Sequence, residues 1–245
     1  MSTDTELSQL NNAIFLDIET APQDDEDLER YVQVVEAGKW AKYAVELKKA
    51  EASGKRKPNR PTMKSESPGL SPFSGRVVAI GMARFVGDPV VFYGQDEMGL
   101  LKSLYAAIQA RDPGKMLFEQ AIESMSRPKV LVTFNGEGFD LPFLAHRAMV
   151  QGLPELARIL PFSRSRRNGQ IIKSVDIYEV MGGKWGINGT LEEYALMYGG
   201  HEFLEGTGYE VEGWWKSGEV GKIARHCRGD ILAMREVAKR LAPVL

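Results

Sequence analysis

The chain has 245 residues and a mass of 27.2 kDa, enough for one sizeable globular domain or two small ones. Hydrophobic residues make up 43% and charged residues 26%, and the formal net charge of -2 gives no global positive field to attract nucleic acid. A single cysteine, Cys227, excludes internal disulfides, and neither a signal peptide nor a membrane-spanning apolar run is present. We therefore expect a cytoplasmic protein.

The first predicted element is a buried strand over 13–16, which ends in two carboxylates, Asp17 and Glu19. The next stretch has a different character, because apolar residues at helical spacing give way to a basic connector rich in proline and serine. It lacks the apolar mass for a core of its own. We therefore expect one domain over 1–245 with a helical and basic insertion at about 24–72.

Strand signals resume after the insertion. Two runs around a glycine turn, 76–85 and 89–93, predict a hairpin. The later elements predicted in chain order are a helix over 98–108, a buried strand over 129–134, a helix over 139–150, a short strand over 174–178, a capped helix over 190–198 and a long helix over 219–241. This order predicts an α/β protein with a mixed sheet.

The carboxylates that end the first strand are the first candidate site residues. Residues i and i+2 of a strand point to the same face, so Asp17 and Glu19 project together. Two buried carboxylates repel each other and are costly to desolvate unless a cation or a proton intervenes. The pair alone leaves three alternatives open: pairing with a lysine or arginine, capping of the next turn, or an acid/base pair as in glycoside hydrolysis.

Two further polar clusters lie farther along the chain. Asp140 follows Asn135 where a strand gives way to a helix, the place where α/β folds bind ligands, although it could act only as an N-terminal helix acid. His226 and Asp230 are four residues apart on the last helix and share one face, as surface pairs often do.

One hypothesis accounts for all three clusters. The four carboxylates form an oxygen-rich site for two hard divalent cations, Mg²⁺ or Mn²⁺, since the chain has too few cysteines and histidines for a usual zinc site. Two such ions stabilise the attacking and leaving oxygens in phosphodiester cleavage, and His226 is the right type of residue to take a proton from water. A glycosidase leaves Asp140 and Asp230 unexplained.

These clusters resemble the three exonuclease motifs of the DEDD superfamily of 3′–5′ exonucleases, most closely the stand-alone group similar to the proofreading domain of family B DNA polymerases. The motifs are Asp17-Ile-Glu19-Thr20, Asn135-x-x-x-Phe139-Asp140, and a base four residues before Asp230. Further similar segments are Arg76–Gly81, Leu131–Leu144, Ser174–Asp176 and Glu210–Trp215. The resemblance covers most of 13–240 except the insertion.

The resemblance implies an RNase H-like fold with a mixed five-stranded sheet flanked by helices. It implies that Asp17, Glu19, Asp140 and Asp230 hold two divalent cations, Mg²⁺ or Mn²⁺. The same resemblance places Thr20, Asn135 and Phe139 near the 3′-terminal nucleotide, with Phe139 as a stacking surface. In this group a tyrosine normally stands at the position of His226, and an acid at that of Arg228.

Other polar and aromatic residues are assigned from the sequence alone. Three arginines in a loop after the second motif are the expected contacts to the nucleic-acid backbone: Arg164, Arg166 and Arg167. Asp176 is expected in mid-strand, with a structural role favoured over that of a fifth acid near the site. Trp185, Trp214 and Trp215 are expected in the core rather than as surfaces that stack on bases.

We therefore expect a metal-dependent 3′–5′ exonuclease that acts on single-stranded or frayed 3′ ends of DNA or RNA, with DNA favoured and a role in DNA repair, without an attached polymerase region. The alternative, motivated by His226 and Arg228, is a nucleic-acid-binding module of the same fold with weakened catalysis. The sequence leaves the oligomeric state open.

Overall fold

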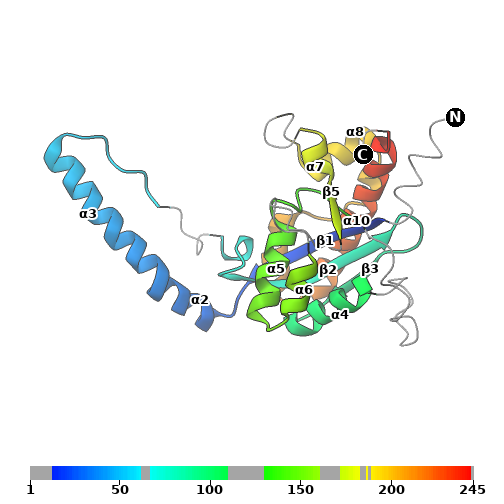
Figure 1. The fold of residues 1–245 in the computed structure, drawn as a ribbon, viewed down its shortest axis with the longest axis horizontal. Coiled ribbons are helices and arrows are strands. Elements are labelled where there is room, and N and C mark those ends of the chain that lie inside the picture. The colour runs from blue at the N-terminus through cyan, green and yellow to red at the C-terminus, as the bar shows by residue number, and fades with distance from the viewer. Residues whose placement is uncertain are drawn as a thin grey trace. The chain divides into compact units, whose positions relative to one another are not determined.

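A computed structural model of the protein describes residues 13–61, 67–109, 130–160, 172–182, 186 and 189–243 (Figure 1). The chain divides into two compact units. The first comprises residues up to Glu19 together with Val77 onward, and the second is Thr20–Arg76. No helix in the described part of the chain is long and apolar enough to cross a bilayer.

The first unit is built on a five-stranded sheet in the order β3-β2-β1-β4-β5. Its strands are β1 (Ala13–Pro22), β2 (Gly75–Arg84), β3 (Val90–Tyr93), β4 (Val130–Thr133) and β5 (Lys173–Asp176). β2 and β3 form an antiparallel hairpin, whereas β4 runs parallel to both β1 and β5. The sheet is therefore mixed, and the predicted five strands and hairpin are confirmed.

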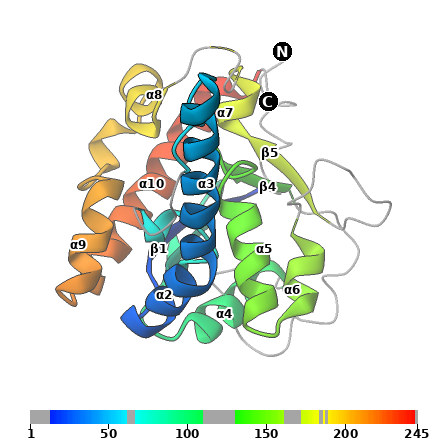
Figure 2. The same ribbon diagram turned by 90° about the vertical axis from the view of Figure 1, so that its left-hand side faces the viewer.

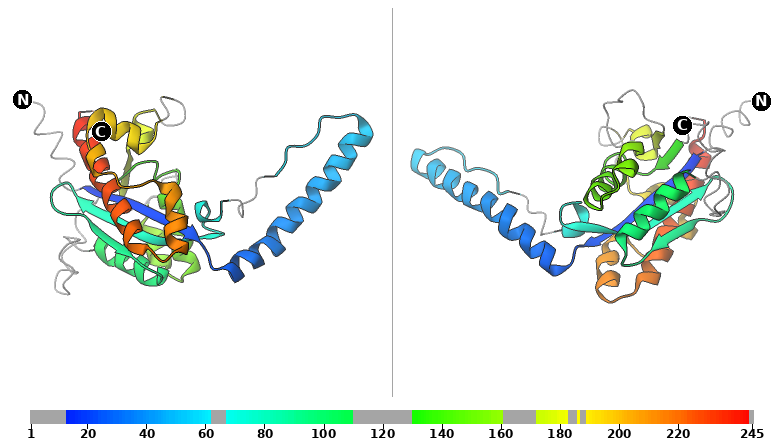
Figure 3. Two further views of the ribbon diagram at one scale, coloured as in Figure 1. Left: turned by 180° about the vertical axis from the view of Figure 1, so that it is seen from behind. Right: turned by 60° about the horizontal axis from the view of Figure 1, so that its bottom comes forward.

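Helices cover both faces of this sheet (Figure 2). One layer consists of α4 (Glu97–Gln109), α5 (Asp140–Val150) and α6 (Pro154–Ile159). The other contains α8 (Leu191–Tyr198), α9 (Val211–Lys216) and the long α10 (Val220–Leu241), which Figure 3 shows against the sheet in orange and red. α7 (Ile177–Val180) and the short turns η6 (His201–Phe203) and η7 (Gly208–Glu210) complete the unit.

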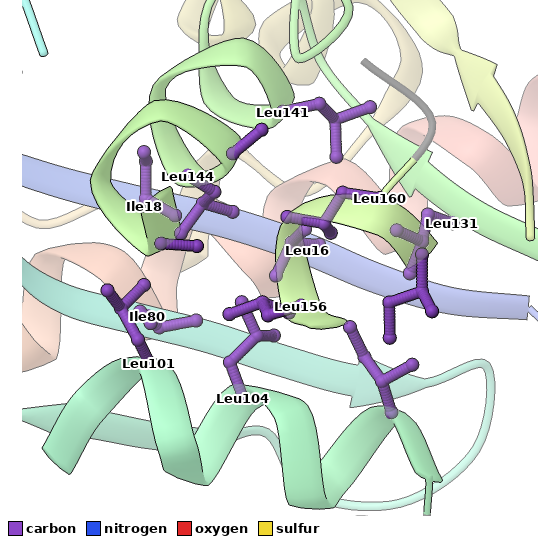
Figure 4. Close-up of a cluster of buried hydrophobic side chains, with 14 of the residues drawn as sticks. Leu16, Ile18, Ile80, Leu101, Leu104, Leu131, Leu141, Leu144, Leu156 and Leu160 are labelled. Atoms are coloured by element: carbon purple, nitrogen blue, oxygen red, sulfur yellow. The ribbon is translucent and has the colours of Figure 1, made fainter. Parts of the chain in front are cut away.

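Successive side chains of β1 point to opposite faces of the sheet, so the strand contributes to the core under each helix layer. Ile14, Leu16 and Ile18 point into the core beneath α4, α5 and α6, which Figure 4 shows filled with leucines. Ala13 and Phe15 belong to the second core, under α8 and α10. The row of odd-numbered side chains continues into Asp17 and Glu19, because successive strand residues alternate between faces. The carboxylates therefore belong to the α10 side of the sheet.

A glycine in β2 lets α10 come close to the sheet. A Cβ atom at Gly81 would lie 2.7 Å from the Cys227 sulfur and 2.9 Å from Cγ1 of Ile231. Any larger residue would push the helix away, since packed interiors do not yield without cost. The absence of a side chain at position 81 thus fixes the depth at which α10 carries its polar residues over β1.

Most predicted elements are confirmed within a residue or two, but β1 continues to Pro22, six residues beyond the predicted strand 13–16. The capped helix begins as expected, because the Thr190 hydroxyl and the Glu193 carboxylate form a capping box at the start of α8. The predicted strand 174–178 ends two residues early, since Asp176 caps α7 instead of continuing the strand. The short helices α6 and α9 were not predicted.

The second unit contains three consecutive helical segments, α2 (Asp25–Tyr31), η1 (Val32–Glu36) and α3 (Ala37–Ser53). The helix ends at Gly54, whose left-handed φ of 63° suits a residue without a Cβ. A connector over 54–61 follows, and the short turn η3 (Pro68–Leu70) precedes β2. The predicted helices of the insertion are confirmed.

Candidate active site

The candidate site is a cluster of four carboxylates from three elements of the first unit. Asp17 and Glu19 come from β1, Asp140 is the first residue of α5, and Asp230 lies in the middle of α10. The Oδ1 atom of Asp140 accepts a hydrogen bond of 3.1 Å from the backbone N–H of Ile18, the residue between the first two acids. This bond fixes the start of α5 against the acidic end of β1.

His226 joins the cluster from α10. Its Nε2 atom lies 3.6 Å from Oε1 of Glu19 and 3.7 Å from Oδ2 of Asp230. The i,i+4 spacing therefore places both α10 residues on one helix face, as predicted. The ring of His226 is 4% exposed, so these contacts are made away from bulk water.

The orientation of the His226 ring is set from its other side. The Nδ1 atom is 2.9 Å from the backbone carbonyl oxygen of Glu205, and since a carbonyl can only accept, Nδ1 must donate. The indole of Trp214 packs edge-on against the imidazole at a centroid distance of 5.9 Å. Nε2 is thereby directed toward the carboxylates.

Glycines allow the segments that hold the His226 ring to pack closely together. A Cβ atom at Gly206 would lie 2.4 Å from Cη2 of Trp214, and one at Gly229 would lie 2.4 Å from the Phe203 carbonyl oxygen. Trp214 is half-buried and contacts the site, so its assignment to the core from sequence was wrong. The Glu205 carbonyl was also missed, because a backbone atom leaves no signal in the sequence.

The carboxylates are crowded with like charges. Burial, followed by the charges of Glu19, Asp140 and Asp230, raises the pKa of Asp17 well above its ordinary range. Burial also raises the pKa of Glu19, with Asp230 and Asp140 adding to the effect. The site therefore disfavours its own ionised form.

The pKa values of Asp140 and Asp230 are also raised, but to a smaller extent. Burial is the main cause that raises the pKa of Asp140 to about 7, although its own backbone N–H and that of Ile18 oppose the change. Burial raises the pKa of Asp230 to about 6, with the neighbouring His226 lowering it and Glu192 raising it.

A divalent cation would fit this donor set. Among the described residues, no lysine or arginine pairs with any of the four carboxylates, and Oδ2 of Asp17 is buried without a hydrogen-bond partner. Ligand atoms of Glu19, His226 and Asp230 lie within 4.8 Å of one another, as do those of Asp17, Glu19 and Cys227. Buried charges without partners are rare unless a metal or proton compensates them.

The buried carboxylate of Glu97 provides a contrast within the same unit. It binds the Arg147 guanidinium through Nε at 2.8 Å and Nη2 at 2.6 Å, and it accepts further hydrogen bonds from Gln151 and the Val77 N–H. A carboxylate with a structural role is thus fully paired here. The four site acids lack such cationic partners in the part of the chain that the structure describes.

Asp176 has a structural position beside the site. Its carboxylate accepts hydrogen bonds from three backbone N–H groups, those of Asn135 and Glu137 at 2.8 Å and that of Tyr178 at 3.1 Å. It therefore holds the turn between β4 and α5, in which Asn135 has a left-handed φ of 57°. The expected structural role is supported, although Asp176 caps a helix rather than lying in mid-strand.

Removing the Asp176 carboxylate is expected to loosen this turn. Asp176→Ala leaves three backbone donors unpaired and lowers the free energy of unfolding by about 2–4 kcal/mol, which urea denaturation measures. Asp176→Asn keeps one acceptor oxygen and is expected to lose about half as much. Equal stability of wild type and Asp176→Ala would contradict this role.

The remaining predicted site residues lie in different settings. Thr20 follows Glu19 in β1 and is half-buried, and Asn135 is exposed. Phe139 is partly buried against the first core and packs on Phe143 at 5.5 Å. The three arginines expected to contact nucleic acid, Arg164, Arg166 and Arg167, lie outside the described residues.

Two further residues of α10, Arg228 and Cys227, lie next to His226 in the chain. Arg228 points away from the carboxylates toward the β2–β3 turn, where its Nη2 atom is 3.6 Å from Oδ1 of Asp88. Cys227 is buried, and burial raises the pKa of its thiol well above the ordinary value, with Asp17 and Glu19 adding to the effect. The thiol therefore stays protonated beside the acids, and a protonated thiol is a poor nucleophile.

Comparison with known proteins agrees with this geometry. The model of a family described as "Predicted 3'-5' exonuclease related to the exonuclease domain of PolB" matches residues 73–235. Among solved structures, the family B DNA polymerase from the hyperthermophilic archaeon Pyrobaculum calidifontis matches with a TM-score of 0.53 and 17% identity. The match covers 94% of this chain and 24% of the polymerase, so the chain spans about a quarter of that protein's length.

The fold is RNase H-like, as expected. No curated protein sequence matches the chain.

Proposed function

Because the chain belongs to the family of predicted 3′–5′ exonucleases related to the exonuclease domain of PolB, we propose that it hydrolyses phosphodiester bonds at the 3′ end of single-stranded or frayed nucleic acid in a metal-dependent reaction, with DNA favoured. The observation that carries this proposal is the convergence of four carboxylates, two of them buried and two half-buried, that have no lysine or arginine partner among the described residues. We further propose that the whole chain is one exonuclease domain and that Thr20–Arg76 is its insertion.

The four carboxylates are the proposed ligands of two divalent cations, Mg²⁺ or Mn²⁺. Asp17 bears the buried oxygen without a partner, and the pKa values of all four acids are raised in a way that a cation would reverse. Two such ions, when bound, supply charge stabilisation to the attacking and leaving oxygens of the phosphodiester. Oxygen ligands favour these hard ions.

His226 is the proposed general base. Its Nδ1–H is held by the Glu205 carbonyl, which leaves Nε2 to accept a proton from the attacking water. Nε2 lies within 4 Å of two of the proposed ligands, Glu19 and Asp230, so the base faces the reacting centre. Trp214 limits rotation of the ring from the other side.

The substrate contacts are proposals that follow the family resemblance. Thr20, Asn135 and Phe139 would lie near the terminal nucleotide, with the exposed edge of Phe139 as a stacking surface. Arg164, Arg166 and Arg167 would contact the backbone. A role in DNA repair is consistent with removal of nucleotides from a DNA 3′ end.

Digestion of end-labelled oligonucleotides tests this function. A single strand labelled at its 5′ end is expected to give a ladder of shortening products when Mn²⁺ or Mg²⁺ is present, and none with a chelator. If the pure protein shortens neither DNA nor RNA with any divalent cation, it is not an exonuclease. Retained binding of strands without cleavage would instead identify it as a nucleic-acid-binding module.

The pH dependence of stability tests whether the four carboxylates form a metal site. Because burial raises the pKa of Asp230 to about 6 and of Asp140 to about 7, the folded metal-free protein binds more protons than the unfolded chain. Its free energy of unfolding is therefore expected to fall as the pH rises from about 4 to about 7.

Divalent cations are expected to oppose this loss. Mn²⁺ competes with protons for the same oxygens, so it should raise the melting temperature more at pH 8 than at pH 5. Thermal unfolding with and without a chelator at both pH values measures the difference. A metal effect that is equal at the two pH values would contradict the assignment of these acids as ligands.

A further inference from the structure

The second unit carries a concentration of positive charge that the proposed function does not use. We call α2, η1, α3 and the connector 54–61 the arm. Residues 39–61 of the arm hold eight lysines and arginines against two glutamates, whereas the whole chain has 31 basic and 33 acidic residues. The rest of the chain therefore has an excess of acid, and the second half of the arm is basic.

The connector covers one face of α3. Its turn at Gly54 brings the Lys55 N–H to the Ala50 carbonyl at 3.0 Å, Lys57 pairs with Glu51 at 3.2 Å, and the Arg60 guanidinium lies over the Trp40 ring at 5.2 Å. Figure 1 shows the connector turning back along the helix. The aromatic side of α3 is therefore partly covered by the chain's own residues, and Trp40 remains 40% exposed.

The other side of α3 is basic and exposed. At about 100° per residue, Lys42 and Lys49 lie opposite Trp40 and Lys48 lies about 80° from it, and Val45 is the exposed large apolar side chain among them. Lys55 and Arg56 add two exposed charges just beyond the helix. None of these five cations forms an ion pair with a described residue. We call these five residues the basic face.

We propose that the basic face, Lys42, Lys48, Lys49, Lys55 and Arg56, binds the phosphate backbone of a single-stranded nucleic acid, an inference that rests on the proposed function. Lysines and arginines in a row bind such strands by releasing counterions, without any need for sequence contacts. The arm begins at Asp25, a few residues after Glu19 in the chain, so a strand on the arm is tethered to the catalytic unit. Tethering raises the effective concentration of its end.

The chemistry of the face favours a nucleic acid over a membrane surface. A helix that lies on a bilayer combines a basic side with a broad apolar side that enters the lipid. In α3 the connector partly covers the aromatic side through Arg60, and the basic face offers only Val45 as a large apolar side chain. The exposed surface is therefore mainly charged, which suits a polyanionic strand.

The test measures strand binding under conditions in which no strand is cut. All proteins are full-length, carry Asp17→Asn and are kept with a chelator. The arm variant adds K42Q, K48Q and K49Q, which preserve the helix propensity of α3, and K55Q beyond its end. The control variant removes as many exposed charges from the first unit through K102Q, R158Q, K239Q and R240Q. Fluorescence anisotropy gives the affinity for strands of about 6 and about 30 nucleotides, below and above the range of common site sizes.

The arm variant is expected to bind the long strand on the order of ten-fold more weakly. The slope of log K against log salt concentration should become shallower by up to about 3, or about 0.7 for each phosphate that the arm no longer neutralises. The control variant is expected to stay within about two-fold of the parent. Wild-type affinity and salt dependence in the arm variant would overturn the proposal, as would an equal loss of affinity in the control.

Three further outcomes separate this inference from membrane binding and from its premise. Loss of binding to phosphatidylserine vesicles with unchanged strand binding would assign the face to a membrane and overturn the proposal. If wild-type protein cuts no strand but the arm variant still loses affinity, the exonuclease proposal fails and the arm proposal stands. If wild-type protein digests strands and the arm variant binds them normally, only the arm proposal fails.

Discussion

Asp17→Asn is expected to abolish exonuclease activity while making the metal-free protein more stable. The substitution removes one proposed ligand, and a loss of at least about 10³-fold in kcat corresponds to about 4 kcal/mol of transition-state stabilisation. The same change removes a buried charge that Glu19, Asp140 and Asp230 repel. We expect the free energy of unfolding near neutral pH to rise by roughly 1–2 kcal/mol, as at other functional sites that sacrifice stability.

The two effects are measured on one protein preparation, by digestion of a labelled strand with Mn²⁺ and by urea denaturation with a chelator. Asp88→Asn is the matched control, because it removes an exposed carboxylate of the first unit that lies beside Arg228. It should leave both quantities near wild type. An Asp17→Asn protein that keeps its activity, or that loses activity only because it unfolds, would contradict the assignment.

His226→Ala is expected to reduce kcat by about 10²- to 10⁴-fold, the usual contribution of general acid–base catalysis. Binding of Mn²⁺ and of the strand should change little, because the four carboxylates remain. The control is His201→Ala, which removes an exposed histidine in η6. Near-normal kcat in His226→Ala would show that His226 is not the base.

His226→Tyr gives a more specific test of the same role. Tyrosine is the residue that the resembling group carries at this position, and its side chain ordinarily loses its proton near pH 10. If the side chain at 226 takes the proton, partial activity should return with an optimum at higher pH than in wild type. A His226→Tyr enzyme with the wild-type pH profile would indicate that another group acts as the base.

The parts of the site that follow local periodicity were predictable from the sequence. Asp17 and Glu19 share a face because they are two residues apart in a strand, and His226 and Asp230 share one because they are four apart in a helix. Their convergence was expected from the family resemblance, and the contacts between Glu19 and His226 agree with it.

The contacts that hold the site residues in place were not predictable from the sequence, because they depend on packing between distant segments of the chain. Trp214 reaches His226 only because Gly206 and Gly229 let neighbouring chain segments approach closely. The Glu205 carbonyl acts through a backbone atom, which every residue carries. Asp176 ends β5 because its carboxylate has three backbone donors to accept from, two of them about forty residues away in the chain.

The central claim is that the four clustered acids of β1, α5 and α10 hold divalent cations. Equilibrium binding of Mn²⁺ to the wild-type protein, followed calorimetrically in buffers of different ionisation enthalpy near pH 6.5, tests it most directly. The account predicts two bound ions for each chain, with protons released on binding because the raised pKa values of Asp140 and Asp230 leave protons to displace. Absence of Mn²⁺ binding, or binding that Asp17→Asn leaves unchanged, would contradict it.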